Sequence, residues 1–152
     1  MSNPISVPNG QQQIASYSPL RVIRPEDIAA HAGPVPGVMH VEAISGPTVG
    51  AQHLQLLRIS VAPGIGVSPV HHHGASEAVF YGLHGCTTFF FGEGLRQRVD
   101  MSAGEFVFIP AWTIHAEANL GNEDAEMFQV CSTPEPTTFV MGELPVPEDL
   151  LR

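Results

Sequence analysis

The sequence predicts an all-β fold, on the evidence of its turn residues and its short alternating stretches. It contains 15 glycines and 14 prolines among 152 residues, the content that many short strands joined by turns require. Between these turn residues, apolar and polar side chains alternate with the two-residue period of a half-buried strand. A chain of this length is one domain of ordinary size and buries enough surface to fold without a metal.

The predicted elements follow each other closely along the chain. Residues 24–30 begin with Arg-Pro-Glu-Asp and predict one short helix, because proline and acidic side chains both suit the first helical turn. Alternation or apolar runs predict strands over residues 38–45, 52–61, 77–83, 86–91, 95–100, 126–132 and 137–141, and on both sides of Pro110.

Charge and composition exclude several classes of function. The formal net charge is −9, and the basic residues are six arginines with no lysine. Nucleic acids and anionic membrane surfaces both require basic patches, so neither is an expected partner. Without lysine the chain cannot form a Schiff base. The N-terminus has no signal-peptide pattern, no apolar run reaches the length of a membrane span, and the two cysteines form no disulfide framework, so we expect a cytoplasmic protein.

Three consecutive histidines, at positions 71 to 73, lead directly into a predicted strand. Side chains alternate along an extended chain, so His71 and His73 project to one side and His72 to the other. Neutral imidazole is the commonest protein ligand for first-row transition metals. A nearby carboxylate favours Fe, Mn, Ni or Co over a closed structural zinc site. The segment therefore predicts two metal ligands and requires a further histidine from elsewhere.

The second segment, residues 104–119, supplies that histidine. It comprises a strand, a turn marked by Pro110 and a second strand that carries His115. Together the two segments resemble the paired motifs of the cupin superfamily. Gly104, Pro110, His115 and Asn119 match the second motif at the family's spacings, with Trp112 where the pattern has glycine.

The first motif is less regular than the second. His71, His73 and Glu77 match its ligand spacing, but seven residues, not six, separate Glu77 from Gly85. If the register is counted back from Gly85, the ligand position falls on Ala78. The resemblance implies a double-stranded β-helix, the cupin jelly-roll barrel, with one divalent transition metal held by His71, His73, His115 and, in one of the two registers, Glu77.

The resemblance covers about residues 50–132, and we expect a single barrel domain over residues 20–142. Residues 1–19 are expected to form an extended arm and residues 143–152 an unstructured tail. Phenylalanines on both faces of residues 86–91 leave an apolar outer face to cover, which predicts a homodimer packed sheet against sheet.

For several other side chains the sequence allows two interpretations of their location or role. Tyr81 shares a face with Glu77 and is either a phenol close to the metal or ordinary barrel packing. Arg58 is expected to be a surface charge, the alternative being an anchor for an anionic substrate. Glu117 shares the face of His115; it is either a second carboxylate near the site or, as we expect, exposed at the barrel mouth. Cys131 is expected to be a buried hydrophobe, the alternative being a place in the pocket, and His40 is expected to be solvated or at the rim.

The cupin fold does not define the reaction, because one scaffold hosts many chemistries. Eight phenylalanines and few cations favour an apolar cavity for a small aromatic or enolisable substrate. We expect a dioxygenase using Fe or Mn, with Ni, Zn, Co or Cu as other candidate metals. In it Glu77, where it is displaced from the metal, acts as the base, and Tyr81 forms a hydrogen bond with the oxyanion. The alternatives are a metal-dependent isomerase, lyase or cyclase and a non-enzymatic small-molecule binding protein.

Overall fold

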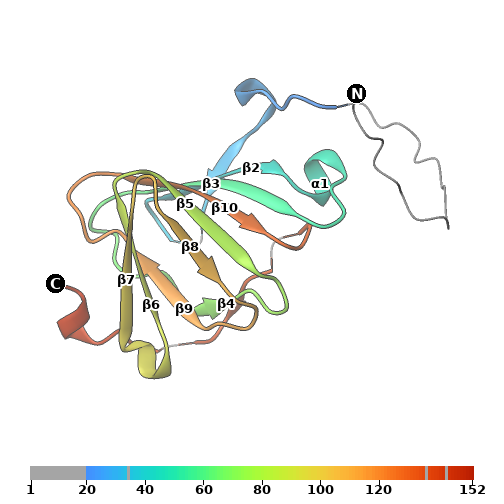
Figure 1. The fold of residues 1–152 in the computed structure, drawn as a ribbon. Coiled ribbons are helices and arrows are strands. Elements are labelled where there is room, and N and C mark those ends of the chain that lie inside the picture. The colour runs from blue at the N-terminus through green and yellow to red at the C-terminus, as the bar shows by residue number, and fades with distance from the viewer. Residues whose placement is uncertain (1–19, 34, 136, 143) are drawn as a thin grey trace, which may run out of the picture.

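The computed structural model describes residues 20–33, 35–135, 137–142 and 144–152. The described strands form two antiparallel sheets that face each other (Figure 1), one with the order β1-β2-β3-β10-β5-β8 and one with the order β11-β4-β9-β6-β7. Their bounds are β1 (Ala30–Ala32), β2 (Val38–Ile44), β3 (Gln55–Val61), β4 (His71–His72), β5 (Ala78–His84), β6 (Cys86–Phe91), β7 (Gln97–Ser102), β8 (Phe106–Ile109), β9 (His115–Ala118), β10 (Ala125–Cys131) and β11 (Phe139–Val140). This arrangement confirms the predicted all-β jelly-roll fold.

The helical elements are short. They are the 3₁₀ turns η1 (Pro25–Asp27), η2 (Glu93–Leu95) and η3 (Glu148–Leu150), and the α-helix α1 (Gly46–Val49). The helix expected at residues 24–30 is therefore a single 3₁₀ turn, and Ile28 and Ala29 connect it to β1. Within the described ranges no helix has the length and apolar character needed to cross a membrane. The predicted arm, residues 1–19, lies outside the described residues.

The core lies between the two sheets. Alternate residues of the central strands point inward, so that Leu57 and Ile59 of β3, Met127 of β10 and Phe80 of β5 join Phe89 of β6 in one apolar cluster. The hairpin between β5 and β6 turns at Gly85, whose φ is 64° and where an added Cβ would lie 2.5 Å from the carbonyl oxygen of Asp124. Only glycine fits there, so Gly85 sets the register of β5.

The outer face of β6 is covered by the chain itself. Phe90 points away from the barrel interior and is fully buried in a second cluster with Leu95, against which Val146 and Leu150 of the C-terminal segment pack. Arg98 donates a hydrogen bond to the carbonyl oxygen of Leu150 at 2.8 Å. The described part of the tail, expected to be unstructured, therefore includes η3 and closes the apolar face from which a homodimer was predicted.

Candidate metal centre

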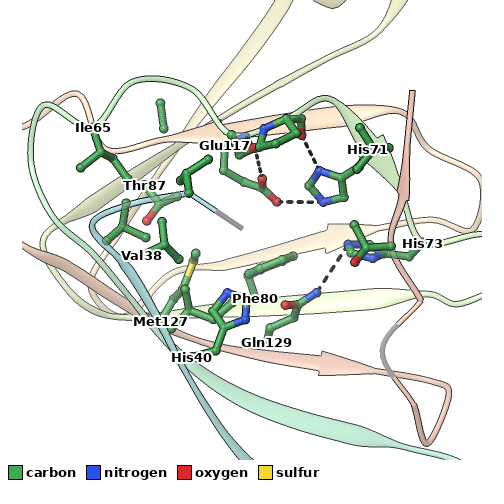
Figure 2. A pocket seen from close by; sticks show the side chains of 18 residues that line it. Val38, His40, Ile65, His71, His73, Phe80, Thr87, Glu117, Met127 and Gln129 are labelled. Atoms are coloured by element: carbon green, nitrogen blue, oxygen red, sulfur yellow. Dashed lines mark hydrogen bonds and ion pairs between the residues drawn. The ribbon is translucent and has the colours of Figure 1, made fainter. Parts of the chain in front are cut away.

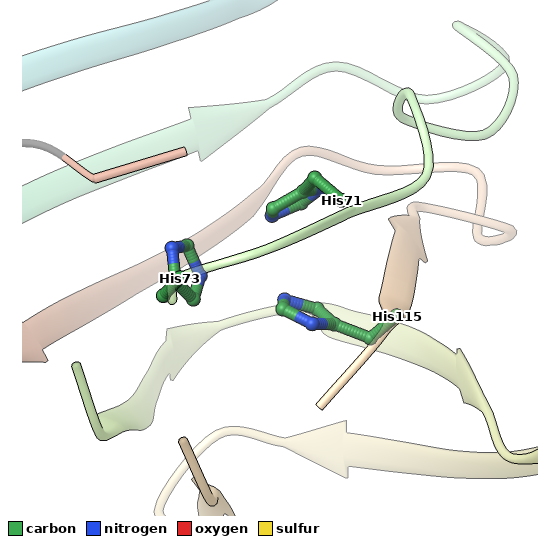
Figure 3. A group of neighbouring side chains, drawn as sticks. All are labelled: His71, His73 and His115. Atoms are coloured by element: carbon green, nitrogen blue, oxygen red, sulfur yellow. The ribbon is translucent and has the colours of Figure 1, made fainter. Parts of the chain in front are cut away.

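Three histidines converge inside the barrel, from two neighbouring strands of the five-stranded sheet. His71 lies in β4, His73 follows that strand directly, and His115 begins β9, where it is the cross-strand partner of His71. All three are buried, and one ring nitrogen from each lies within 4.8 Å of the others (Figure 3). Three imidazoles at this spacing form a group that can hold a divalent transition metal.

Backbone carbonyls fix the protonation of the three rings. The Nδ1 atoms of His71, His73 and His115 lie 2.8, 2.8 and 2.9 Å from the carbonyl oxygens of Pro69, Thr137 and Thr113. A carbonyl oxygen only accepts hydrogen bonds, so each Nδ1 carries the proton. In a neutral ring the Nε2 lone pair is then free, which is the tautomer that binds metals through Nε2.

The Nε2 atom of His115 is buried and has no hydrogen-bond partner of acceptable geometry among the described residues. A buried unpaired polar atom carries a free-energy penalty of about 1–3 kcal/mol. A bound metal would satisfy this atom together with the other two Nε2 atoms. The residues present therefore fit a metal, and the fit does not depend on any resemblance.

Glu117 brings a carboxylate to the same point (Figure 2). Its Oε1 atom lies 3.2 Å from Nε2 of His115 and 3.7 Å from Nε2 of His71, and 14% of its side chain is exposed. Ser68 donates its hydroxyl proton to Oε2 at 2.7 Å, and the Glu117 amide donates to the Ser68 oxygen at 2.9 Å. Ser68 therefore holds both the backbone and the side chain of Glu117.

The electrostatics of the group follow from burial and from this carboxylate. Burial lowers the pKa of His73 to about 4, with further lowering by His115 and His71. Burial also opposes charge on His115, but the neighbouring Glu117 outweighs it and raises the pKa of His115. For Glu117, burial is outweighed by the close contact of Oε1 with His115, the charges of His71 and His115 and the Ser68 hydroxyl, which lower its pKa to about 2. The centre thus holds a neutral His73 beside an ionised carboxylate.

A cavity of about 110 Å³ opens beside the histidines, between the two sheets. Its walls are mainly apolar, with Val38, Ile59, Phe80 and Met127 among the lining residues. The polar lining residues include Gln129, whose amide nitrogen lies 3.4 Å from Nε2 of His73. Since the two ends of an amide are assigned from their contacts, Gln129 can also present its oxygen to a metal at this point.

Comparisons with known proteins identify the fold. Residues 57–131 match the cupin domain family. The chain belongs to the cupin superfamily. It is 25% identical to Auxin-binding protein 1 of Arabidopsis thaliana over 123 residues, which are 77% of this chain and 61% of that longer protein.

Two solved cupin-like structures show the same fold. The polyketide cyclase RemF from Streptomyces resistomycificus has a TM-score of 0.67 and 22% identity, over 86% of this chain and 91% of that one. The oxalate decarboxylase of Lactobacillus farciminis has a TM-score of 0.65 and 21% identity, over 76% of this chain but 34% of the decarboxylase. At these identities the likeness concerns the fold alone.

The structure places the first-motif glutamate differently from the cupin pattern. Glu77 is exposed, lies just before β5 and is not part of the three-histidine group. Ala78, which is 1% exposed, takes the inward position. The physical reason is the register set by Gly85: counting back with the cupin spacing leads to Ala78, and Glu77 then faces outward. The carboxylate that lies beside the three histidines is instead that of Glu117, within the segment of the second motif.

Tyr81 shares the outward face with Glu77. Its ring lies 4.6 Å from that of Phe106 on the outer surface of the six-stranded sheet, and it does not line the cavity. Arg58 is half exposed and pairs with Glu126, as expected of a surface charge. Cys131 is buried within the apolar core and is not among the cavity residues.

The turn before His115 carries the departure from the cupin glycine. Trp112 has a φ of 65°, a left-handed conformation that is rare for a bulky residue. Its amide donates to the carbonyl oxygen of Gly74 at 2.7 Å, and its ring lies 5.7 Å from that of His72. His72 stacks in turn on Phe139. As predicted, His72 is outside the metal group; it joins an aromatic contact between the two ligand-bearing segments.

Sequence reasoning undervalued three residues of the site. Glu117 and His40, expected at the mouth or rim, both line the cavity, as does Gln129, which was assigned only to a strand. A signal for Glu117 was present, because a His-x-Glu pair on one strand necessarily shares a face. The positions of Gln129 and His40 depend on how the two sheets face each other, which local periodicity does not contain.

Proposed function

We propose that the protein is a metal-dependent enzyme that enolises a small, largely apolar carbonyl compound, as an isomerase, lyase or cyclase does. The single observation that carries this proposal is the position of the Glu117 carboxylate, between the histidines and the apolar cavity. His71, His73 and His115 would hold the metal. Fe, Mn, Ni, Co, Zn and Cu all accept three imidazoles, so the donor set leaves the metal open.

The roles follow from the positions of the chain's own groups. The metal would act as a Lewis acid that polarises a substrate carbonyl and so lowers the pKa of the C–H group on the adjacent carbon. Glu117 takes the proton from that carbon, since one of its oxygens is fixed by Ser68 and the other faces the histidines. The apolar walls exclude water, which strengthens the electrostatic interactions within the cavity.

Glu77 and Tyr81, expected as base and oxyanion donor, have no part in this proposal because both face outward. Glu117 takes the place of Glu77 as the base. If Glu117 instead coordinates the metal, its replacement by glutamine will lower metal affinity as well as turnover. If it is the base, the Glu117→Gln variant will keep its metal.

A dioxygenase remains the second candidate. Three neutral ligands would leave several coordination positions open beside the apolar cavity, an arrangement that suits a dioxygenase. A non-enzymatic binding protein is the third; the relative from Arabidopsis thaliana, named for binding auxin, supports that class.

The deciding experiment separates proton abstraction from oxygen consumption. The protein, purified without a histidine tag and loaded with Mn(II) or Fe(II), is incubated with 1,3-dicarbonyl and 2-oxo compounds in D₂O. We expect exchange of the carbon-bound hydrogen, followed by NMR, which continues under argon and is lost in Glu117→Gln. Stoichiometric oxygen uptake, with no turnover under argon, would instead favour the dioxygenase. Ligand binding without exchange or oxygen uptake would favour the binding protein.

We also propose that the protein is a homodimer, through a different face from the one predicted. Val130, Val79 and Phe108 are cross-strand neighbours on the outer face of the six-stranded sheet, as are Phe128, Tyr81 and Phe106. The Phe106 and Phe108 side chains are 70% and 58% exposed. An antiparallel sheet with one solvated face normally alternates apolar with polar residues, and a self-complementary apolar face suits a twofold interface.

Light scattering should give twice the 16.3 kDa chain mass, and the Phe108→Glu variant should give the mass of one chain.

A further inference from the structure

His40 is a cavity residue without a role in the chemistry proposed above. It lies on β2 of the six-stranded sheet, opposite the wall of the five-stranded sheet that carries His71 and Glu117 (Figure 2). Val38 precedes it on the same inward face, and Ile59 is its cross-strand partner. An imidazole is thus set into an apolar wall, facing the centre across the space where a substrate would lie.

The ring of His40 makes an edge contact with that of His31, with the ring centroids 5.7 Å apart, but no hydrogen bond from the described residues fixes its place. Among the described residues none forms a hydrogen bond with it, whereas each ligand histidine is fixed by a carbonyl oxygen. A polar group in an apolar surrounding costs free energy unless it is paired. A substrate group that reaches this wall would supply the missing partner.

The charges around His40 define what that partner is. Burial lowers its pKa, and so does His31 of β1, against the opposing charges of Glu117 and Glu42. At neutral pH the ring is therefore uncharged, with one nitrogen that donates and one that accepts. No arginine occurs among the described residues that line the cavity. A carboxylate or phosphate has no counter-ion at this end, so the group that fits is a hydroxyl, carbonyl or amide.

The volume limits the rest of the molecule. The cavity measures about 110 Å³, whereas an apolar cavity of about 150 Å³ accommodates one benzene molecule. The enclosed part of the ligand is therefore no larger than one six-membered ring. A bicyclic aromatic does not fit without movement of the walls.

We infer that His40 determines specificity by binding an uncharged oxygen or amide group at the end of the substrate remote from the metal. The substrate is then a compact molecule with a carbonyl at the histidine end, a short apolar middle and a neutral polar group at the other. This inference rests on the proposed function, because it takes the three-histidine centre as the point where the carbonyl binds.

Paired hydroxamate probes test this inference on the full-length, Co(II)-loaded protein. Propano- and butanohydroxamate bind metals through the same head group as their 3-hydroxypropano and 4-hydroxybutano counterparts, so each pair isolates the terminal hydroxyl. We expect this hydroxyl to strengthen binding about three- to tenfold at one of the two lengths, the value of one hydrogen bond. Calorimetry gives the ratio of dissociation constants within each pair.

The variants assign that ratio to His40. His40→Phe should abolish the gain, His40→Gln should retain most of it, and His53→Phe, at an exposed histidine outside the cavity, should leave it unchanged. Because the ratio is internal to each pair, a general weakening in a variant does not affect it, and His40→Ala replaces His40→Phe if the larger ring disturbs folding.

A gain that survives His40→Phe and His40→Ala would overturn the inference, as would no gain at either length in the wild type. Those outcomes, with hydroxamates still bound, leave the proposed function intact. Failure of every hydroxamate to bind the Co(II) protein would contradict both.

Discussion

Glu77 and Glu117 each follow a ligand histidine by a few residues, yet the structure brings only Glu117 to the centre. His115 and Glu117 are two residues apart on the unbroken strand β9, so they necessarily share a face. β4 ends at His72, and between His73 and Glu77 the chain turns through Gly74, which has a φ of 59°. The alternation of side chains is therefore lost before β5 begins. The face of a residue follows from a neighbour only along an uninterrupted strand.

The largest effect should come from replacing one of the three histidines that form the metal centre. His73→Ala or His115→Ala should abolish stoichiometric binding of a transition metal, because two imidazoles hold it far less tightly than three. His72→Ala is the matched control and should retain it, since His72 stacks on Phe139 outside the group. Elemental analysis of untagged protein measures the metal content. Close to one metal per chain in either ligand variant would contradict the site.

Exchange of each carboxylate for an amide compares the two glutamates directly. Glu117→Gln should lower kcat by about 10²–10⁴, the range of a general base, with metal content preserved. Glu77→Gln should change kcat by less than about threefold, because its side chain is exposed. Steady-state kinetics under saturating metal give both values. Equal losses in the two variants would place the base elsewhere.

Metal removal separates the contribution of the centre from that of the fold. At 100 times its dissociation constant a metal adds about 2.7 kcal/mol to the free energy of unfolding, or about 5–10 °C in Tm for a domain of this size. Calorimetry before and after chelation should show this shift, with strand content by circular dichroism unchanged. An unfolded metal-free protein would mean that the apolar core alone does not sustain the barrel.

The smallest expected effect comes from introducing a carboxylate at position 78, where the cupin pattern counted back from Gly85 places its ligand. Ala78→Glu places it on the inward face of β5, where the native residue is 1% exposed. The metal-free variant should lose about 1–3 kcal/mol of stability through overpacking. Its gain in Tm on metal addition should exceed that of the wild type, because a fourth ligand is then available. An equal gain would show that the position does not reach the metal.

The parts that the sequence predicts well are those specified by local rules. The apolar alternation placed Leu57, Ile59 and Val61 of β3 on one face, which is the inward face in the structure, and the two motifs predicted the three histidines that converge. The boundaries of β6, Cys86–Phe91, agree with the prediction. Each of these features depends on short-range period or on turn residues with a defined spacing.

The features that the sequence predicts poorly depend on contacts between distant segments of the chain. The C-terminal cover of Phe90 is one, since nothing near residue 90 in the sequence points to Leu150. The place of His40 is another, because it depends on the opposing sheet. The division into arm, barrel and tail, and the cytoplasmic location, stay predictions.

The turn at Trp112 has a practical consequence. This is the only tryptophan of the chain, and its amide is bonded to Gly74, the residue that follows His73. Its indole therefore lies on a short covalent and hydrogen-bonded path from two of the three ligand histidines. Fluorescence excited at the indole band comes from one defined point beside the centre. Quenching by Co(II) or Cu(II) can then be followed in real time, so Trp112 is an intrinsic fluorescent reporter of metal binding and release.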